Sequence, residues 1–147
     1  MQRNKINKIY DSVKKINRAY DIWSANHGLT LYEMQVYYVI LENGGGPITQ
    51  KDLCKQLDAP KTSINSIIKK QLSSERIMME VNPLNKREKI IALTSDGRDF
   101  AEKLIFPLFR YEEEAIASIK DSDFDIAIGV QTEFADNLLK KAGNKDE

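Results

Sequence analysis

The sequence predicts a mainly α-helical fold that carries one small β-hairpin. Apolar residues recur at helical spacing near both ends of the chain, and two capping patterns precede helical segments in its middle. Two short β-prone runs then flank a polar stretch at residues 82–88. The middle of the chain therefore predicts helix, turn, helix and hairpin, which is the order of a winged helix-turn-helix.

A first helix is predicted over residues 5–26, because apolar residues recur there in steps of three and four. These residues are Ile6, Ile9, Val13, Ile16, Tyr20 and Trp23. Such a seam near a chain end indicates packing on another helix, from the same chain or from a second subunit. Thr30 and Glu33 form a capping-box pattern for a second helix, and the glycines at residues 44–46 with Pro47 end it. One face of this helix is expected to carry Leu31, Met34, Tyr38 and Leu41.

A third, short helix is predicted over residues 49–57, where Thr49 and Asp52 repeat the capping pattern. Pro60 suits the first turn of a fourth helix, which is predicted to end near residue 73. The buried side of this fourth helix is expected to consist of Ile64, Ile67, Ile68 and Leu72.

The segments 77–81 and 89–93 are predicted to be paired strands, joined by a loop over residues 82–88. Thr94 is expected to cap a long helix that Pro107 kinks. Its apolar side would carry Phe100, Leu104, Leu108, Tyr111, Ala115 and Ile119. A last helix is predicted to start within residues 121–125. The elements therefore divide the chain into an N-terminal helix at residues 1–30, a winged helix-turn-helix at 31–97, and C-terminal helices at 98–147.

Composition narrows the class of protein. The chain has 147 residues, of which 41% are hydrophobic and 30% charged, and this composition fits one soluble domain. No segment of the sequence is long and apolar enough to span a membrane. We therefore expect no membrane partner and a cytoplasmic location. His27 is the only histidine, which disfavours imidazole zinc sites and His-based triads; we expect no metal, no cofactor and no enzymatic activity. Cys54 is the only cysteine, and is expected to be a small buried residue, with oxidant sensing as the alternative.

Charge is distributed unevenly although the net charge is zero. Residues 49–93 contain nine Lys/Arg and five Asp/Glu, a net charge of +4, so the rest of the chain carries −4. Between residues 94 and 136, eleven acids face four bases. A separation of this kind allows one region to meet phosphate while another avoids it.

Two segments of the basic region could contact nucleic acid. If the isoleucines of the fourth helix face the core, a polar face points outward, consisting of Lys61, Thr62, Asn65, Ser66 and Lys69. Asn and Ser can read base edges in a major groove, and a helix N-terminus attracts phosphate. Lys86 and Arg87 on the hairpin tip could reach a minor groove. The alternatives are a solvated helix face and a solubilising loop.

Three motifs resemble the MarR family of bacterial transcription regulators: Ala59-Pro60-Lys61-Thr62-Ser63-Ile64-Asn65, Asn82-Pro83-Leu84-Asn85-Lys86-Arg87, and Leu93-Thr94-Ser95-Asp96-Gly97. The resemblance spans nearly the whole chain and implies a homodimeric winged-helix repressor, or less often an activator, on a pseudo-palindromic site in double-stranded DNA. It also implies that residues 1–30 are a dimerisation helix and that the helices of residues 98–147 complete the dimerisation region. The implied DNA-binding residues are Thr49, Pro60, Lys61, Thr62, Ser63, Asn65, Ser66, Lys69, Lys70, Asn85, Lys86 and Arg87. The chain departs from the family at Asn85 and Lys86, where Asp and Arg are frequent, and at Ser66, where a basic residue is frequent.

The resemblance also implies a small aromatic effector that weakens DNA binding. Candidate pocket residues are Tyr20, Trp23, Tyr37 and Tyr38, for which ordinary core and dimer contacts are the alternative. A second reading of the whole chain is a winged-helix module that binds protein and not DNA. It would require apolar anchors on the outer face of the fourth helix, and the sequence places none there.

Overall fold

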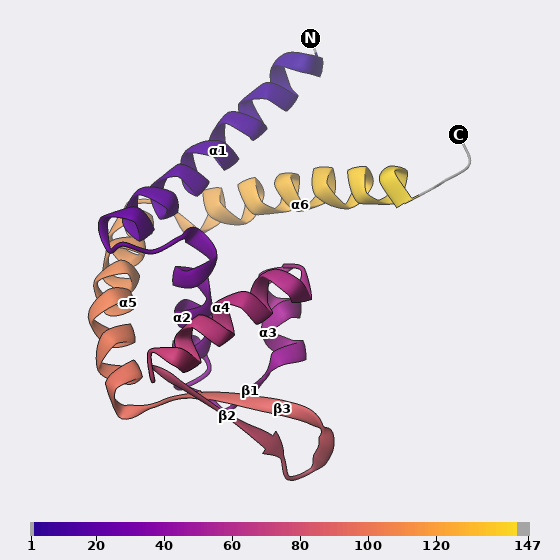
Figure 1. Ribbon diagram of the computed structural model, residues 1–147. Coiled ribbons are helices and arrows are strands. Elements are labelled where there is room, and N and C mark those ends of the chain that lie inside the picture. The colour runs from indigo at the N-terminus through magenta and orange to yellow at the C-terminus, as the bar shows by residue number, and fades with distance from the viewer. Residues whose placement is uncertain (1, 144–147) are drawn as a thin grey trace. The chain divides into compact units, whose positions relative to one another are not determined.

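The computed structural model describes residues 2–143. Along this range it contains helices α1 (Gln2–Asn26), α2 (Leu31–Glu42), α3 (Gln50–Leu57), α4 (Lys61–Ser73), α5 (Ser95–Ile116) and α6 (Asp121–Gly143), and strands β1 (Ile48–Thr49), β2 (Ile77–Asn82) and β3 (Asn85–Leu93) (Figure 1). The chain forms two compact units, residues 15–109 and residues 1–14 with 110–147. The predicted mainly helical fold with a small β-hairpin is confirmed. Among the helices in the described range, none is both long and apolar enough to cross a membrane.

The starts of α2 and α3 follow from their capping residues. The hydroxyl of Thr30 accepts a hydrogen bond from the Glu33 amide at 3.2 Å, and the Glu33 carboxylate accepts one from the Thr30 amide at 2.8 Å. This is the predicted capping box, which satisfies two backbone N–H groups that the helix itself leaves unpaired. Thr49 caps α3 in the same way by accepting from the Asp52 amide at 3.0 Å. Both predicted helix starts are confirmed.

The core of the larger unit surrounds α2. The single apolar face predicted for this helix is too narrow, because α2 is buried on most sides, with Val36, Tyr37, Val39 and Ile40 in the core as well as Met34 and Leu41. The Tyr37 ring packs edge-on against Phe100 of α5, with 5.1 Å between ring centroids. The remaining buried apolar residues come from all other elements of the unit except α1: Ile48, Leu53, Ile64, Ile68, Ile77, Ile91, Leu93, Ala101, Leu104, Ile105 and Leu108.

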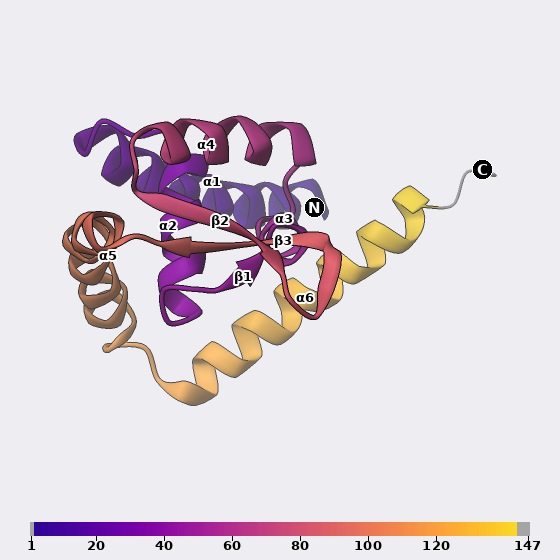
Figure 2. The ribbon, with the colours of Figure 1, turned by 60° about the horizontal axis from the view of Figure 1, so that its bottom comes forward.

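The small sheet is antiparallel in the order β1-β3-β2, and its hairpin projects beyond α3 (Figure 2). Strand β1 was not predicted, because two residues are too few to show an alternating pattern. The predicted loop over residues 82–88 is wrong in extent. Asn82 pairs with Asn85 and Val81 pairs with Lys89, so Pro83 and Leu84 alone form the turn. Residues 86–88 bulge out of the ladder between these two pairs.

Several helix boundaries differ from the sequence prediction. Pro60 stands at the N-cap of α4 and not in its first turn. Gln71 takes a fully buried position on α4, where the sequence pattern favoured the neighbouring Leu72, because its side-chain oxygen accepts a hydrogen bond from the Tyr37 hydroxyl. Helix α5 contains Pro107 but ends at Ile116, so Ile119 lies in the following turn and not on the helix face.

The junction between the hairpin and α5 depends on Thr94 and Gly97. The Thr94 hydroxyl donates to the Glu75 carbonyl at 2.6 Å and accepts from the Gly97 amide at 3.0 Å, and the Thr94 amide donates to the Arg76 carbonyl at 3.1 Å. A Cβ at residue 97 would lie 1.6 Å from the Arg76 carbonyl oxygen. The Leu-Thr-x-x-Gly motif therefore has a physical reason: threonine closes the base of the hairpin and glycine permits the approach of α5.

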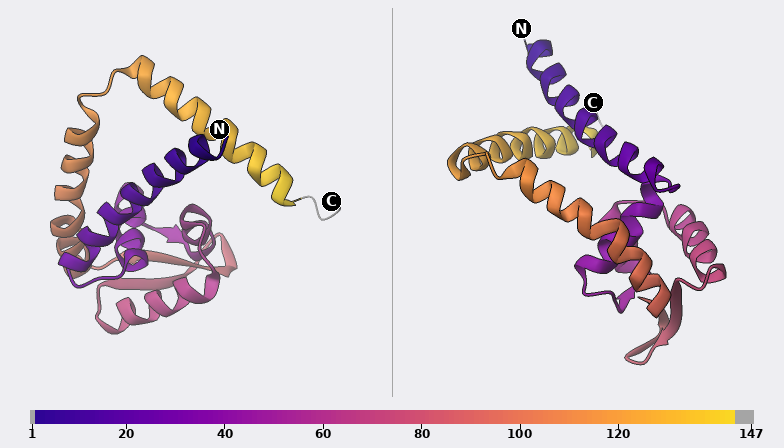
Figure 3. Two further views of the ribbon diagram at one scale, coloured as in Figure 1. Left: turned by 90° about the horizontal axis from the view of Figure 1, so that it is seen from above. Right: turned by 90° about the vertical axis from the view of Figure 1, so that its left-hand side faces the viewer.

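The smaller unit pairs the start of α1 with α6, and the left view of Figure 3 shows the two helices crossing. Tyr10 and Phe134 meet edge-on, with 6.5 Å between ring centroids. No residue of α6 within the described range is buried, and its exposed apolar residues include Ile126, Val130 and Leu139. The rest of the chain therefore leaves most of the apolar surface of α6 exposed to solvent.

Substitution of Gly97 by alanine should destabilise the protein by about 1–3 kcal/mol, because the new methyl group would overlap the Arg76 backbone. Thermal and urea unfolding measure the change. Gly129 is the matched control: it lies within α6 and an added Cβ there meets nothing within 4 Å. Gly129→Ala should therefore be neutral or stabilising by up to about 1 kcal/mol, as glycine is a weak helix former. Equal effects of both substitutions would contradict the steric explanation.

Candidate nucleic-acid interface

Helix α4 presents a polar face opposite its core anchors. Ile64 and Ile68 are buried in the larger unit and hold the helix in place. Lys61, Thr62, Ser66 and Lys69 are exposed, and Ser63 and Asn65 are half-buried. The N-cap, Pro60, makes no side-chain hydrogen bond to the helix, so the first N–H groups of α4 are left for water or a ligand. This end of the helix can receive an anion.

A concave basic surface joins α3, α4 and the wing. We call it the basic hollow; it encloses about 620 Å³ and is lined by Thr49, Gln50, Lys51, Cys54, Lys61, Asn65, Arg87, Glu88 and Lys89. Four of these were among the predicted DNA-binding residues: Thr49, Lys61, Asn65 and Arg87. Four cationic side chains against one carboxylate make the hollow positive. The structure thus brings two predicted contact segments together on one surface.

Five residues of the basic hollow were not predicted as DNA-binding residues: Gln50, Lys51, Cys54, Glu88 and Lys89. Lys51 and Lys89 contribute to the excess of basic residues in the middle of the chain, but charge counting does not reveal which of them share a surface. That information requires the register of β3 against β2, where Lys89 pairs with Val81, and the placement of α3 beside β3. Gln50 contributes no charge and had no signal in the sequence beyond its position next to Thr49.

The wing is shaped by two asparagine side chains. The Asn82 side-chain oxygen accepts from the Leu84 amide at 3.0 Å, and the Asn85 side-chain oxygen accepts from the Arg87 amide at 3.1 Å. The Asn82 amide nitrogen also donates to Glu88 at 3.2 Å. These bonds hold the tight turn and the bulge, and they leave Lys86 and Arg87 exposed. Asn85 therefore supplies through its amide oxygen the acceptor that an aspartate would supply at this position.

Comparisons of the chain with known proteins and solved structures agree with this architecture. No family model matches the chain. It is 25% identical over 123 residues to the uncharacterised HTH-type transcriptional regulator YwoH of Bacillus subtilis, covering 84% of this chain and 88% of that protein. Among solved structures, a MarR family regulator from Neisseria meningitidis, NMB1585, matches with a TM-score of 0.81 at 17% identity, over 97% of this chain and 99% of that one. Staphylococcus aureus MepR in its DNA complex matches with a TM-score of 0.72 at 14% identity, over 88% and 92%.

The chain has the MarR winged-helix fold. The resemblance inferred from the motifs of α4, the wing and the Leu-Thr-x-x-Gly segment is confirmed. Within this fold, α3 and α4 form the helix-turn-helix and the β2–β3 hairpin forms the wing.

The aromatic residues proposed for an effector pocket are separated in this MarR fold. Tyr20 and Tyr38 line a hollow of about 320 Å³ together with Met34, Gln35, Val39, Glu42, Gln56 and Leu57. Tyr37 is fully buried, which raises the pKa of its hydroxyl despite the opposing effect of Arg76. Trp23 donates from its indole nitrogen to the Leu104 carbonyl at 3.2 Å. Only two of the four predicted residues therefore share a hollow.

Cys54 was considered for oxidant sensing, and His27 for a zinc site or a catalytic triad. Cys54 is half-buried and lines the basic hollow. The Nδ1 atom of His27 lies 2.7 Å from the Trp23 carbonyl oxygen, to which it donates, so His27 caps the end of α1 beside Gly28. Within residues 2–143, no three His, Cys, Asp or Glu side chains gather closely enough to hold a metal ion.

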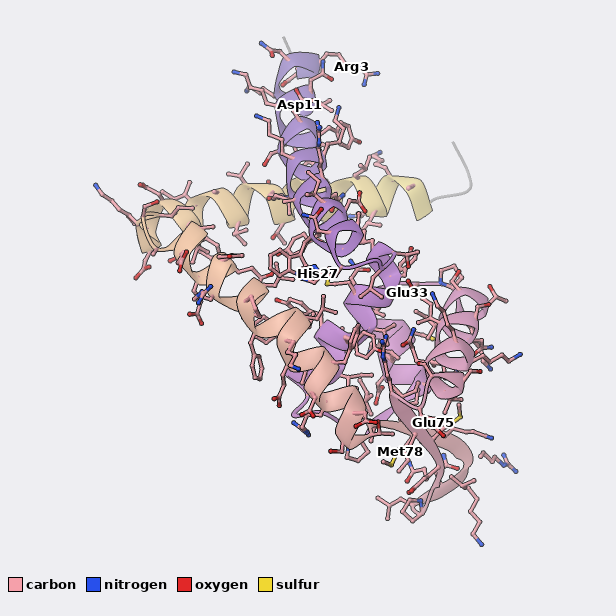
Figure 4. The ribbon with its side chains drawn as sticks, turned by 60° about the vertical axis from the view of Figure 1, so that its left-hand side comes forward. Arg3, Asp11, His27, Glu33, Glu75 and Met78 are labelled. Carbon is pink, nitrogen blue, oxygen red and sulfur yellow. The ribbon has the colours of Figure 1, made fainter. Side chains whose placement is uncertain are left out.

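Lys70, a predicted DNA-binding residue, has a partner inside the protein. Its ammonium group is hydrogen-bonded to the carboxylate of Glu33, whose side chain is only 5% exposed. Glu33 lies at the start of α2 (Figure 4). Burial raises the pKa of Glu33, but the hydrogen bonds from Lys70 and Thr30 outweigh it and hold the pKa below its ordinary value. The pair ties α4 to the capping box of α2, and Glu33 neutralises the charge of Lys70.

Replacement of Glu33 by glutamine should lower the free energy of unfolding at neutral pH by about 1–3 kcal/mol, because a charge-assisted bond is lost while the capping box survives. The depressed pKa means that the stabilisation is present above the ordinary carboxyl pKa and is lost as pH falls through the lower pKa of the folded state. The difference between wild type and Glu33→Gln should therefore shrink in acid. Urea unfolding across pH measures it.

The control is Glu42→Gln, which removes an exposed carboxylate from the same helix. It should change stability little at any pH. A gap between wild type and Glu33→Gln that stays constant from neutral to strongly acidic pH would show that the carboxylate charge of Glu33 contributes nothing.

Proposed function

We propose that the chain is a sequence-specific DNA-binding transcriptional regulator, most simply a repressor, that binds a pseudo-palindromic operator as a homodimer. The observation that carries the proposal is the continuous basic surface formed by the N-terminal half of α4, the basic hollow and the bulged wing. YwoH is described as a transcriptional regulator, and MepR of the same fold has been solved with DNA. Both descriptions support the proposal.

In this proposal the two segments contribute differently. Lys61, Thr62, Asn65, Ser66 and Lys69 of α4 enter a major groove, where Asn65 and Ser66 contact base edges and the lysines contact phosphate. Lys86 and Arg87 of the wing reach the adjacent minor groove. Thr49, Pro60 and Ser63 flank the phosphate backbone. Lys70 contributes least, because Glu33 already neutralises its charge.

The proposed homodimer would form through α1 and α6. An apolar groove of about 470 Å³ on the smaller unit is lined by Ile9, Tyr10, Val13, Gln131, Phe134, Ala135, Leu138, Leu139 and Ala142. Together with the exposed Ile126 and Val130, these residues form an apolar surface of the kind that marks a protein interface. A second copy of the chain is the occupant that a pseudo-palindromic site requires, since two-fold DNA symmetry matches a two-fold dimer.

A small aromatic effector is proposed to bind the hollow that contains Tyr20 and Tyr38, at the end of α1 and beside α2 and α3. A ligand there would contact both α2 and α3, whose placement sets the orientation of α4. The competing function, a protein-binding winged helix, lacks support because the exposed residues of α4 are polar.

Substitution of Lys86 or Arg87 by alanine should weaken binding to the DNA upstream of the protein's own gene. Each lost phosphate contact should also reduce the slope of log K against log salt by about one, because fewer counterions are released. Fluorescence anisotropy at several salt concentrations measures both. Lys103→Ala, which removes one exposed charge from α5, is the control and should leave affinity and slope unchanged. A chain that binds no duplex with sequence preference would refute the proposed function.

Substitution of Leu139, which is 70% exposed on α6, by glutamate should weaken or abolish the homodimer, because it places a charge in the apolar groove. Sedimentation velocity over a range of concentrations measures the association. Ser118→Glu introduces the same charge in the exposed turn after α5 and should leave it intact. A wild-type chain that sediments as a monomer at all concentrations would overturn the dimer.

A further inference from the structure

Gln50 and Asn65 form a side-chain pair inside the basic hollow. Gln50 is the first residue of α3, fifteen residues before Asn65 in the middle of α4. The Gln50 amide nitrogen Nε2 donates a hydrogen bond to the Asn65 amide oxygen Oδ1. Both residues are half-buried and both line the hollow. The pair therefore links the helix that reads bases, in the proposed function, to a helix that does not.

This bond determines which end of the Asn65 amide is available to a ligand. An asparagine amide has one oxygen that accepts and one nitrogen that donates twice. A free asparagine commonly reads adenine by accepting from N6 and donating to N7. In this protein the oxygen of Asn65 is turned towards Gln50, so the nitrogen is the end that remains to meet a base edge. A donating nitrogen matches the major-groove acceptors O6 and N7 of guanine and O4 of thymine.

We propose that Gln50 is a positioning residue for base recognition: it orients the Asn65 amide so that Asn65 donates to guanine or thymine instead of making the two-point contact with adenine. This inference rests on the proposed DNA-binding function and names the base preference of that same site. Gln50 needs no contact with DNA for this role, because it acts through the side chain that it holds.

If the bond between Gln50 and Asn65 were only a structural link between α3 and α4, its loss would have a different effect on DNA binding. Loss of such a link lowers stability and weakens binding to every sequence alike. Loss of an orienting bond changes the preference at the base pair that Asn65 faces and leaves the phosphate contacts, and hence the salt dependence, intact. The two roles are therefore separable by measuring base preference.

The test begins with selection of duplexes from a randomised DNA pool by the full-length wild-type chain. Every single base-pair variant of the selected site is then titrated with wild type, Gln50→Met, Asn65→Ala and the double variant. Methionine keeps the length of glutamine and removes the donor. Gln2→Met, the same substitution at an exposed residue of α1 outside the basic hollow, is the control. Thermal melting checks that each variant folds.

We expect Asn65→Ala to remove a guanine or thymine preference at one base pair of each half-site. Gln50→Met should reduce the preference at that same base pair about tenfold, with adenine better tolerated and the salt slope unchanged. The double variant should be no worse than Asn65→Ala alone, because Gln50 acts through Asn65. The Gln2→Met control should behave as wild type.

An unchanged preference in Gln50→Met, or an equal loss on all sequences, would overturn the proposal and leave a structural link. If Gln50→Met does not fold, Asn65→Asp decides, because it keeps the acceptor for Gln50 and removes the donors; survival of the guanine or thymine preference in Asn65→Asp would likewise overturn it. A wild-type chain that selects no sequence would instead refute the proposed function, and the inference with it.

Discussion

The hydrogen-bonded junction at Thr94 is the constraint on which the candidate interface depends. Through its hydroxyl and amide, Thr94 binds the carbonyls of Glu75 and Arg76, the residues that connect α4 to β2. The same hydroxyl caps α5 by accepting from Gly97. One residue thus joins the end of α4, both ends of the hairpin and the start of α5. The wing cannot change its angle to α4 without breaking these bonds.

A second constraint is electrostatic and acts over short distances. The chain carries no net charge, yet the basic hollow gathers four cationic side chains against one carboxylate. Lys70 lies on the same helix as Lys61 but is bound by the buried Glu33. In salt, charges beyond about 10 Å are largely screened. The charges of individual surfaces, and the partners that individual lysines already have, therefore decide where an anion can bind.

Local patterns predicted the elements well, and tertiary contacts account for the errors. Capping at Thr30 and Thr49 lies within a few residues of sequence, so both helix starts could be predicted. The extent of the wing could not be predicted, because the side chains of Asn82 and Asn85 close a tight turn where the sequence indicated a loop over residues 82–88. Burial of Gln71 depends on Tyr37, thirty-four residues away. The full composition of the basic hollow likewise depends on three elements meeting.

The departure at Asn85 shows how one residue can change the charge of the wing while keeping its shape. The bulge needs an acceptor for the Arg87 amide, and an amide oxygen meets that need as a carboxylate does. A carboxylate would also place a negative charge beside Lys86 and Arg87 and reduce their attraction to phosphate. The neutral asparagine avoids that cost. Glu88 sits close by, but its carboxylate accepts from the Asn82 amide, which keeps it at the base of the bulge. The wing of this chain therefore has less internal charge pairing than an aspartate at residue 85 would give.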